Sequence, residues 1–173
     1  MKYMDDLPVR NTVKPEKKQK ASKSSPEKTV KLKNQATLDF RAQKLRSLPE
    51  KLGELDQVQS LILSRNKLAS LPSNIGQLQK LQVLNLSHNF ELTALPDSFG
   101  LLRSLQTLLL HDNKLLKLPE NFGELESLQL LYLQSNKLTC LPESFVKLKA
   151  LQILDLRRNV LTYLPEDFGN FRL

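Results

Sequence analysis

The sequence predicts an α/β solenoid over residues 35–173, built from six stacked coils that each hold one short strand and one short helical turn. The first observation is a Leu-Pro dipeptide that recurs every 23 or 24 residues, at Pro49, Pro72, Pro96, Pro119, Pro142 and Pro165. The second is that all five glycines of the chain lie four residues after one of these prolines, while Val146 takes that place in the fifth copy. The third is a set of asparagines in the same phase: Asn66, Asn89, Asn113, Asn136 and Asn159.

Each copy divides into a strand, a turn and a return segment. Leu84-x-Leu86 alternates leucine with other residues, which indicates a short strand with its leucines facing inward. Asn89 follows the strand, where we expect its amide to satisfy buried backbone groups beside the next copy. The return segment begins at Leu95-Pro96, and we expect proline at the first position of a short helical turn. Acidic residues follow the proline in five copies, and we interpret them as caps of the turn's positive end rather than catalytic acids.

These motifs resemble the intracellular leucine-rich repeats of about 23 residues that occur in Ras-suppressor, Ras-scaffold and Scribble-like proteins. The resemblance covers about residues 35–173. It implies a leucine-rich-repeat solenoid that winds as a right-handed superhelix, with short parallel strands on the concave face and short helical turns on the convex side. It also implies that protein partners bind mostly to the concave face. A single copy cannot bury its own leucines, so stability must come from stacking on neighbouring copies.

Three places depart from the repeat. In the first copy Phe40 replaces a strand leucine and Gln43 replaces the asparagine, as is usual in a terminal copy. The third copy carries one extra residue near Phe90, which is either a tolerated loop insertion or an exposed binding anchor. No polar capping copy precedes Leu173, so we expect the C-terminal cap to be missing. The chain is then either a fragment of a longer solenoid or is capped by a partner or a second copy of itself.

Alternation along the strands predicts which side chains line the concave face. We expect an apolar stripe there, made of Ile62, Val83, Leu109, Leu130, Tyr132 and Ile153, with Tyr132 as the strongest anchor. We expect polar and charged residues to complete the partner-binding face: Arg65, Asn85, His88, His111, Asp155, Arg157 and Arg158. The alternative is that the aliphatic residues only stabilise the strands through cross-strand packing.

The same face carries one candidate metal cluster. His88, His111 and Asp112 fall on adjacent strands, and they form a metal site, a pH switch or a group of ordinary contact residues. We expect contact residues, and hence no metal and no cofactor.

The positive charge of the chain lies mostly in its first 34 residues. Residues 1–34 hold ten Lys/Arg and four Asp/Glu, a net charge of +6, whereas the remaining 139 residues are at +2. This composition predicts a disordered basic tail. Within it, Lys17-Lys18-Gln19-Lys20 resembles a nuclear-import signal and Ser25-Pro26 resembles a kinase site. Cys140 is the only cysteine and no secretory signal precedes it, so we expect a cytoplasmic or nuclear protein.

These features predict a non-catalytic protein–protein interaction module, an adaptor in intracellular signalling. One alternative is a substrate-recognition subunit of a ubiquitin ligase, although no ligase-recruiting segment is visible. Another is weak, non-specific nucleic-acid association through the tail, which lacks interleaved aromatic residues for base stacking. The sequence has no glycine-rich phosphate loop, HExxH or CxxC motif, so we expect neither catalysis nor a small-molecule substrate. It also has no uninterrupted apolar run long enough to span a membrane.

Overall fold

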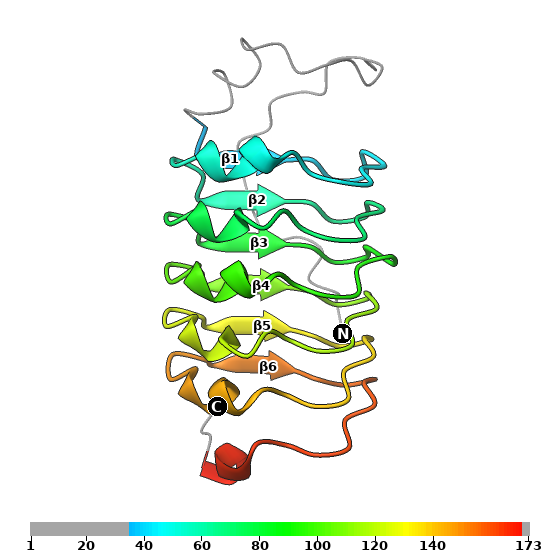
Figure 1. The fold of residues 1–173 in the computed structure, drawn as a ribbon, viewed down its shortest axis with the longest axis vertical. Helices are drawn as coiled ribbons and strands as arrows, with labels where there is room; N and C mark the ends of the chain where they lie inside the picture. The colour runs from blue at the N-terminus through cyan, green and yellow to red at the C-terminus, as the bar shows by residue number, and fades with distance from the viewer. Residues whose placement is uncertain (1–34, 171–173) are drawn as a thin grey trace.

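The computed structural model describes residues 35–170 as one column of six coils stacked along the long axis of the molecule (Figure 1). The predicted basic tail, with its import-like and kinase-like motifs, lies outside the described residues. The strands are β1 (Thr37–Asp39), β2 (Ser60–Ile62), β3 (Val83–Asn85), β4 (Thr107–Leu109), β5 (Leu130–Tyr132) and β6 (Ile153–Asp155). The 3₁₀ turns are η1 (Glu50–Glu54), η2 (Ile75–Gln77), η3 (Asp97–Leu101), η4 (Phe122–Glu124), η5 (Glu143–Lys147) and η6 (Glu166–Asn170).

The strands form a single parallel sheet in the order of the chain, β1 to β6, and the 3₁₀ turns line the opposite side. Each strand pairs with the next one in the same register, so that Leu84 lies beside Leu108 and Leu108 beside Leu131. This arrangement confirms the predicted α/β solenoid of six coils. No helix among the described residues is long and apolar enough to cross a membrane.

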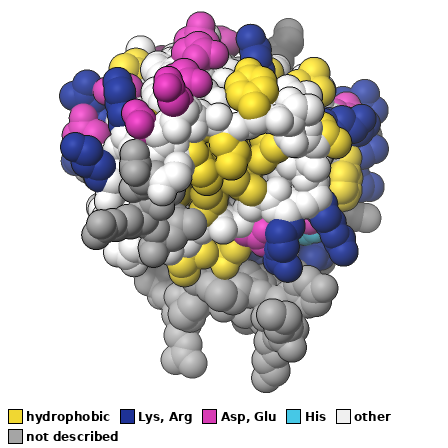
Figure 2. Space-filling view, turned by 90° about the horizontal axis from the view of Figure 1, so that it is seen from below, with side chains coloured by type: hydrophobic (Ala, Val, Ile, Leu, Met, Phe, Trp, Pro, Cys, Tyr) yellow, Lys and Arg dark blue, Asp and Glu magenta, His cyan; other side chains and the backbone are white. Residues whose placement is uncertain are grey.

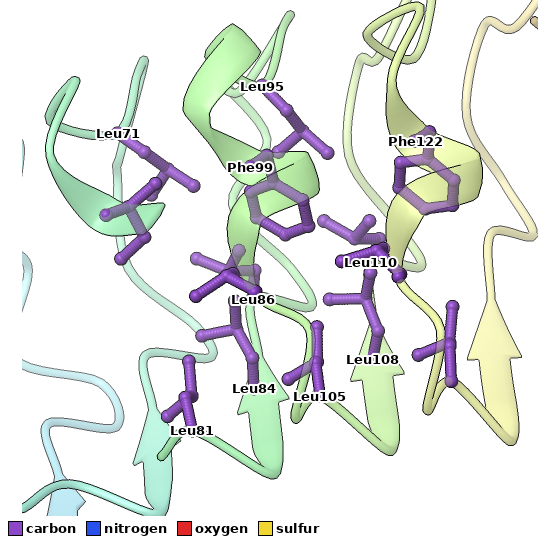
Figure 3. Close-up of a cluster of buried hydrophobic side chains, with 14 of the residues drawn as sticks. Leu71, Leu81, Leu84, Leu86, Leu95, Phe99, Leu105, Leu108, Leu110 and Phe122 are labelled. Carbon is purple, nitrogen blue, oxygen red and sulfur yellow. The ribbon is translucent and has the colours of Figure 1, made fainter. Parts of the chain in front are cut away.

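The core fills the space between the sheet and the 3₁₀ turns (Figure 3). Leu84 and Leu108 point into this space from their strands, and both are fully buried, as predicted for inward leucines. Phe99 and Phe122 enter it from the opposite side and are also fully buried. Because each coil contributes only one layer of side chains, the core is continuous along the column and no coil has a core of its own.

The repeated asparagines form a buried ladder of hydrogen bonds behind the strands. The Nδ2 of Asn89 donates to the carbonyl oxygens of Leu63 and Leu86, at 3.1 and 2.9 Å. Its Oδ1 accepts a hydrogen bond from the N–H of Leu68, at 3.1 Å. The same pattern recurs at Asn66, Asn136 and Asn159. The ladder confirms the predicted role of this amide, which joins two successive coils.

The prolines lie before the 3₁₀ turns and not at their first position: by one residue at Pro49, Pro96 and Pro142, and by three residues at Pro72 and Pro119. Pro49, Pro96 and Pro142 are extended, with ψ between 147° and 156°, and the 3₁₀ turn begins at the following residue. The expectation that proline opens the turn was therefore wrong. The proline carbonyl instead accepts the first hydrogen bond of the turn, as in Leu52 N–H to Pro49 O at 2.9 Å.

Glycine occurs within these turns because successive coils approach each other closely there. No glycine of the described chain has a positive φ, so backbone conformation does not require it. A Cβ built on Gly123 would instead overlap the carbonyl oxygen of Ser144 in the next coil. Gly169 is the exception, because nothing lies within 4 Å of its would-be Cβ.

A column of phenylalanine rings shows which side of the solenoid is concave. The ring centroids of Phe99 and Phe122 lie 6.2 Å apart, those of Phe122 and Phe145 lie 6.1 Å apart, and each pair is parallel within 2°. Neighbouring strands lie about 4.8 Å apart. The coils are therefore spaced more widely on the side of the 3₁₀ turns, which places the sheet on the concave side.

The fifth coil breaks this regularity, because Val146 stands at the glycine position. The ring of Phe145 is inclined by 34° to that of Phe168, although the centroids are still 6.1 Å apart. A side chain at Val146 prevents the close backbone approach that glycine permits. We attribute the tilt between the Phe145 and Phe168 rings to this steric difference.

The inward apolar side chains of the sixth coil are less buried than the equivalent side chains of the other coils. Leu154 and Leu156 are half-buried, whereas their counterparts Leu131 and Leu133 in the fifth coil are fully buried. Figure 2 views the molecule from this end and shows hydrophobic side chains gathered at its centre, with charged side chains toward the rim.

Candidate functional site

The concave sheet face is less apolar at its surface than the sequence predicts. Ile62 and Leu109 point outward from β2 and β4, yet each is only 6 % exposed. The expectation that they form part of an exposed stripe was therefore wrong. Side chains on neighbouring strands stand about 4.8 Å apart, so those in the middle of the sheet cover one another. Alternation predicts the face of the sheet on which a side chain lies, but it does not predict how far neighbouring side chains bury it.

The accessible apolar residues concentrate at β5 and β6. Leu130 and Tyr132 of β5 are half-buried, and Ile153 of β6 is 47 % exposed. Parallel pairing places Leu130 directly beside Ile153. These three residues, which we call the β5–β6 apolar cluster, are what remains accessible of the predicted stripe, together with the half-buried Val83 of β3.

A row of four aromatic and imidazole rings crosses the face just beyond the strands. Its ring centroids are 6.0 Å apart between Phe90 and His88, 5.2 Å between His88 and His111, and 6.3 Å between His111 and Tyr132. All three contacts are edge-to-face, a favourable geometry for aromatic pairs. His88, His111 and Tyr132 were predicted on this face, whereas Phe90 was expected only as a loop insertion or an exposed anchor, and the row that joins all four was not predicted. The row connects the insertion of the third copy to the β5–β6 apolar cluster, and Phe90 itself is 58 % exposed.

The backbone that carries part of this row has an unusual conformation. In each coil the second residue after the Leu-x-Leu segment has a φ between 55° and 58°, and none of these residues is glycine: Ala42, Arg65, His88, Asp112, Ser135 and Arg158. Hydrogen bonds hold this conformation in place, as between the His88 N–H and the His111 carbonyl oxygen at 3.0 Å. Non-glycine residues rarely adopt positive φ, and the six residue types share no feature that predicts it.

One of the arginines predicted on the concave face, Arg157, forms an ion pair with Asp155. The guanidinium of Arg157 binds the carboxylate of Asp155, with Nη2 2.7 Å from Oδ2 and Nε 3.0 Å from Oδ1. The side-chain hydrogen bond from Arg157 is the largest of the effects that lower the pKa of Asp155 below its usual value of 3.8. Arg157 is therefore occupied by Asp155 rather than available to steer a partner, whereas Arg158 is exposed.

A related side-chain arrangement occurs in the middle of the sheet. The Oδ1 of Asn85 accepts hydrogen bonds from the N–H and the hydroxyl of Ser87, at 3.0 and 2.8 Å. This predicted contact residue is thus half-buried and fixed by its own strand end. Its amide nitrogen stays on the concave side, where a partner can meet it.

A basic pocket of about 430 Å³ opens beside the insertion of the third copy. Its walls include three cationic side chains, Lys44, Arg65 and Lys67, and also the row residues His88 and Phe90. One carboxylate, that of Glu91, also lines it. Only Arg65 and His88 of these residues were predicted as site residues. Lys44 and Lys67 were missed because they belong to loops after the strands, where alternation carries no information.

The comparisons with known proteins agree with this architecture. A family model described as "Leucine-rich repeat region" matches residues 50–137, and one described as "Leucine rich repeat" matches residues 118–167. No curated protein sequence matches the chain.

Among solved structures, a leucine-rich-repeat protein of Leptospira interrogans is 36 % identical over 83 % of this chain, with a TM-score of 0.65. The leucine-rich-repeat domain of the type III effector XopL is 26 % identical over 86 % of this chain, with a TM-score of 0.70. The ectodomain of the receptor kinase SOBIR1 from Arabidopsis thaliana is 28 % identical over 74 %, with a TM-score of 0.62. This chain spans 43 % of the Leptospira chain, 53 % of the XopL chain and 70 % of the SOBIR1 chain. The matched family models and the shared coil architecture show that the chain belongs to the leucine-rich-repeat family.

Proposed function

We propose that the chain is a non-catalytic adaptor in intracellular signalling that binds a protein partner on its concave sheet face. Leucine-rich-repeat domains generally mediate protein–protein interaction, which supports the class of function. The observation that carries the choice of face is the ring row Phe90–His88–His111–Tyr132, whose last residue belongs to the β5–β6 apolar cluster. Aromatic side chains with an apolar body and a polar edge are the residues that most often dominate binding energy.

The chemistry of the face defines the segment that fits it. The β5–β6 apolar cluster suits aliphatic or aromatic side chains, whereas the basic pocket at Lys44, Arg65 and Lys67 suits carboxylates or phosphates. The distance from β2 to β6 is four strand spacings, about 19 Å. An extended segment rises about 3.3 Å per residue, so about six residues bridge the two regions. The proposed ligand is therefore a short segment with apolar residues at one end and acidic residues at the other.

Selection of peptides on the immobilised chain tests this proposal. A library of random peptides should yield sequences that combine apolar and acidic residues about six positions apart. The double variant Tyr132→Ala/Ile153→Ser should weaken binding of the selected peptides at least tenfold, because both side chains are accessible and neither belongs to the buried core. Unchanged binding by this variant, with an intact circular-dichroism spectrum, would refute the proposed face.

The matched control is Leu101→Ser, which removes an apolar side chain of comparable exposure from η3 on the opposite side. We expect this variant to bind as the wild type does. Charge reversal at Lys67 should lower affinity for the acidic peptides and reduce the dependence of affinity on salt concentration. A loss of binding that is equal in the Leu101→Ser variant would locate the interaction away from the concave face.

A further inference from the structure

Three metal-ligating side chains converge on the concave face. His88, His111 and Asp112 each offer one ligand atom, and these three atoms all lie within 4.8 Å of one another. The Nδ1 of His88 is 3.6 Å from the Oδ2 of Asp112, which is too long for a good hydrogen bond. Around a tetrahedral ion with bonds of about 2.0–2.1 Å, ligand atoms are about 3.3–3.4 Å apart. The His88–Asp112 pair already has nearly this separation, and the third ligand atom, from His111, lies within 4.8 Å of both.

The solenoid holds these ligands on a fixed frame. His88 and Asp112 occupy equivalent positions of successive coils and have the same backbone conformation, with φ of 56° and 57°. Their N–H groups donate to the carbonyl oxygens of His111 and Gln134 in the following coils, at 3.0 and 3.1 Å. The two side chains therefore leave the sheet side by side, and His111 precedes Asp112 directly. Ligands fixed by a rigid scaffold bind a metal with less ordering cost than ligands on free loops.

The surroundings of the cluster suit a partly open site. The side chains of His88 and Asp112 are 27 % and 35 % exposed, so they are shielded by neighbours but reachable from solvent. His111 is fixed on its other side by the edge-to-face contact with Tyr132. Three protein ligands leave a fourth position for water or for a donor atom of a bound molecule.

We propose that His88, His111 and Asp112 form a binding site for a divalent transition-metal ion of the zinc class. Two imidazoles and one carboxylate favour Zn²⁺, Co²⁺ or Ni²⁺ over Mg²⁺ and Ca²⁺, which prefer all-oxygen ligands. The site does not depend on the proposed partner, because all three ligands come from this chain. Metal binding can therefore be tested separately from the proposed function, because it is measured on the isolated protein without a partner.

Titration of the full chain with Zn²⁺, followed by nuclear magnetic resonance of the histidine rings, tests the site directly. The chain has only two histidines and both lie in the cluster, so the ring signals report on it without background. We expect both rings to shift together and to saturate at one Zn²⁺ per chain. We also expect a large excess of Mg²⁺ not to displace the Zn²⁺. Rings that stay unperturbed at saturating Zn²⁺ would overturn the proposal.

The variants His88→Asn and Asp112→Asn identify the ligands. Asparagine tolerates positive φ better than most residues, so these variants should keep the fold, which circular dichroism checks. We expect each to bind Zn²⁺ at least tenfold more weakly. The control is Cys140→Ser, because the single thiol is the other soft ligand of the chain, and we expect it to bind as the wild type does. Wild-type affinity in either asparagine variant, or loss of binding in Cys140→Ser, would refute the assignment.

Discussion

Removal of one rung of the asparagine ladder gives a direct measure of how the coils are held together. Asn89 is fully buried, and its side chain makes four hydrogen bonds to the backbone, of which the bond to the Ser87 carbonyl oxygen is the longest, at 3.4 Å. In Asn89→Ala the two carbonyl oxygens keep a second donor, because Leu63 O still accepts from Asn66 and Leu86 O from Asn113. Only the N–H of Leu68 loses its sole side-chain partner.

The expected loss of stability follows from this count. An orphaned buried N–H costs about 1–3 kcal/mol, whereas each lost bond to a carbonyl oxygen contributes only about 0.5 kcal/mol, because those oxygens keep another donor. We therefore expect Asn89→Ala to lower the free energy of unfolding by about 3 kcal/mol. With a urea slope of about 2 kcal/mol per M, the midpoint should fall by about 1.5 M. Equilibrium unfolding in urea, followed by far-UV circular dichroism, measures this shift.

Two further variants sharpen the test. Asn89→Asp keeps an acceptor for Leu68 but places a carboxylate against two carbonyl oxygens, so we expect it to be at least as destabilising as alanine. Asn159→Ala removes the equivalent rung in the sixth coil, where the amide is only partly buried, and should cost less. A loss below about 1 kcal/mol for Asn89→Ala, with an unchanged urea slope, would contradict the assigned role of the ladder.

Three other outcomes follow from packing and charge. Leu108→Ala should lower the free energy of unfolding by about 2–5 kcal/mol in the same urea assay, since its side chain is fully buried, and a change well under 1 kcal/mol would contradict its inward position. Gly123→Ala should lower the free energy of unfolding by about 1–3 kcal/mol, because its Cβ would overlap the next coil. Gly169→Ala has open space around its Cβ and should change that free energy by less than about 0.5 kcal/mol. Equal effects of the two substitutions would refute the close-approach argument. The depressed pKa of Asp155 should contribute stability above about pH 3.8 that is lost as the pH falls through its folded value, and Arg157→Met should return that pKa toward 3.8 in a carboxyl carbon NMR titration.

The period of the sequence was sufficient to predict the fold. Leucines, asparagines and prolines recur because equivalent positions in every coil have the same environment. The inward position of Leu108 and the hydrogen bonds of Asn89 could therefore be predicted from the pattern of a single copy. The predicted position of Pro49 failed by one residue, because the carbonyl of this proline rather than its ring opens the turn. That distinction depends on ψ, which side-chain identity does not encode.

The candidate site was predictable only in outline. Alternation correctly identified the outward residues of β5, but it could not show that neighbouring strands bury Leu109. The ring row depends on His88 leaving the strand with a positive φ, and histidine gives no sign of that conformation in a sequence. The occupation of Arg157 by Asp155 likewise depends on rotamers, since both residues lie on the same strand end and either could face a partner.

The valine at the fifth glycine position has a consequence for how the molecule opens. The asparagine ladder joins all six coils, but only coils one to five also approach closely at a glycine, whereas the sixth meets the fifth across a bulkier residue and a tilted ring pair. In a one-dimensional stack each boundary has its own free energy, so the weakest boundary separates first. We expect amide hydrogen exchange to be fastest beyond Val146 and to slow progressively toward the middle coils. Local opening of the solenoid then begins at the sixth coil, before the cooperative unfolding of the remaining coils.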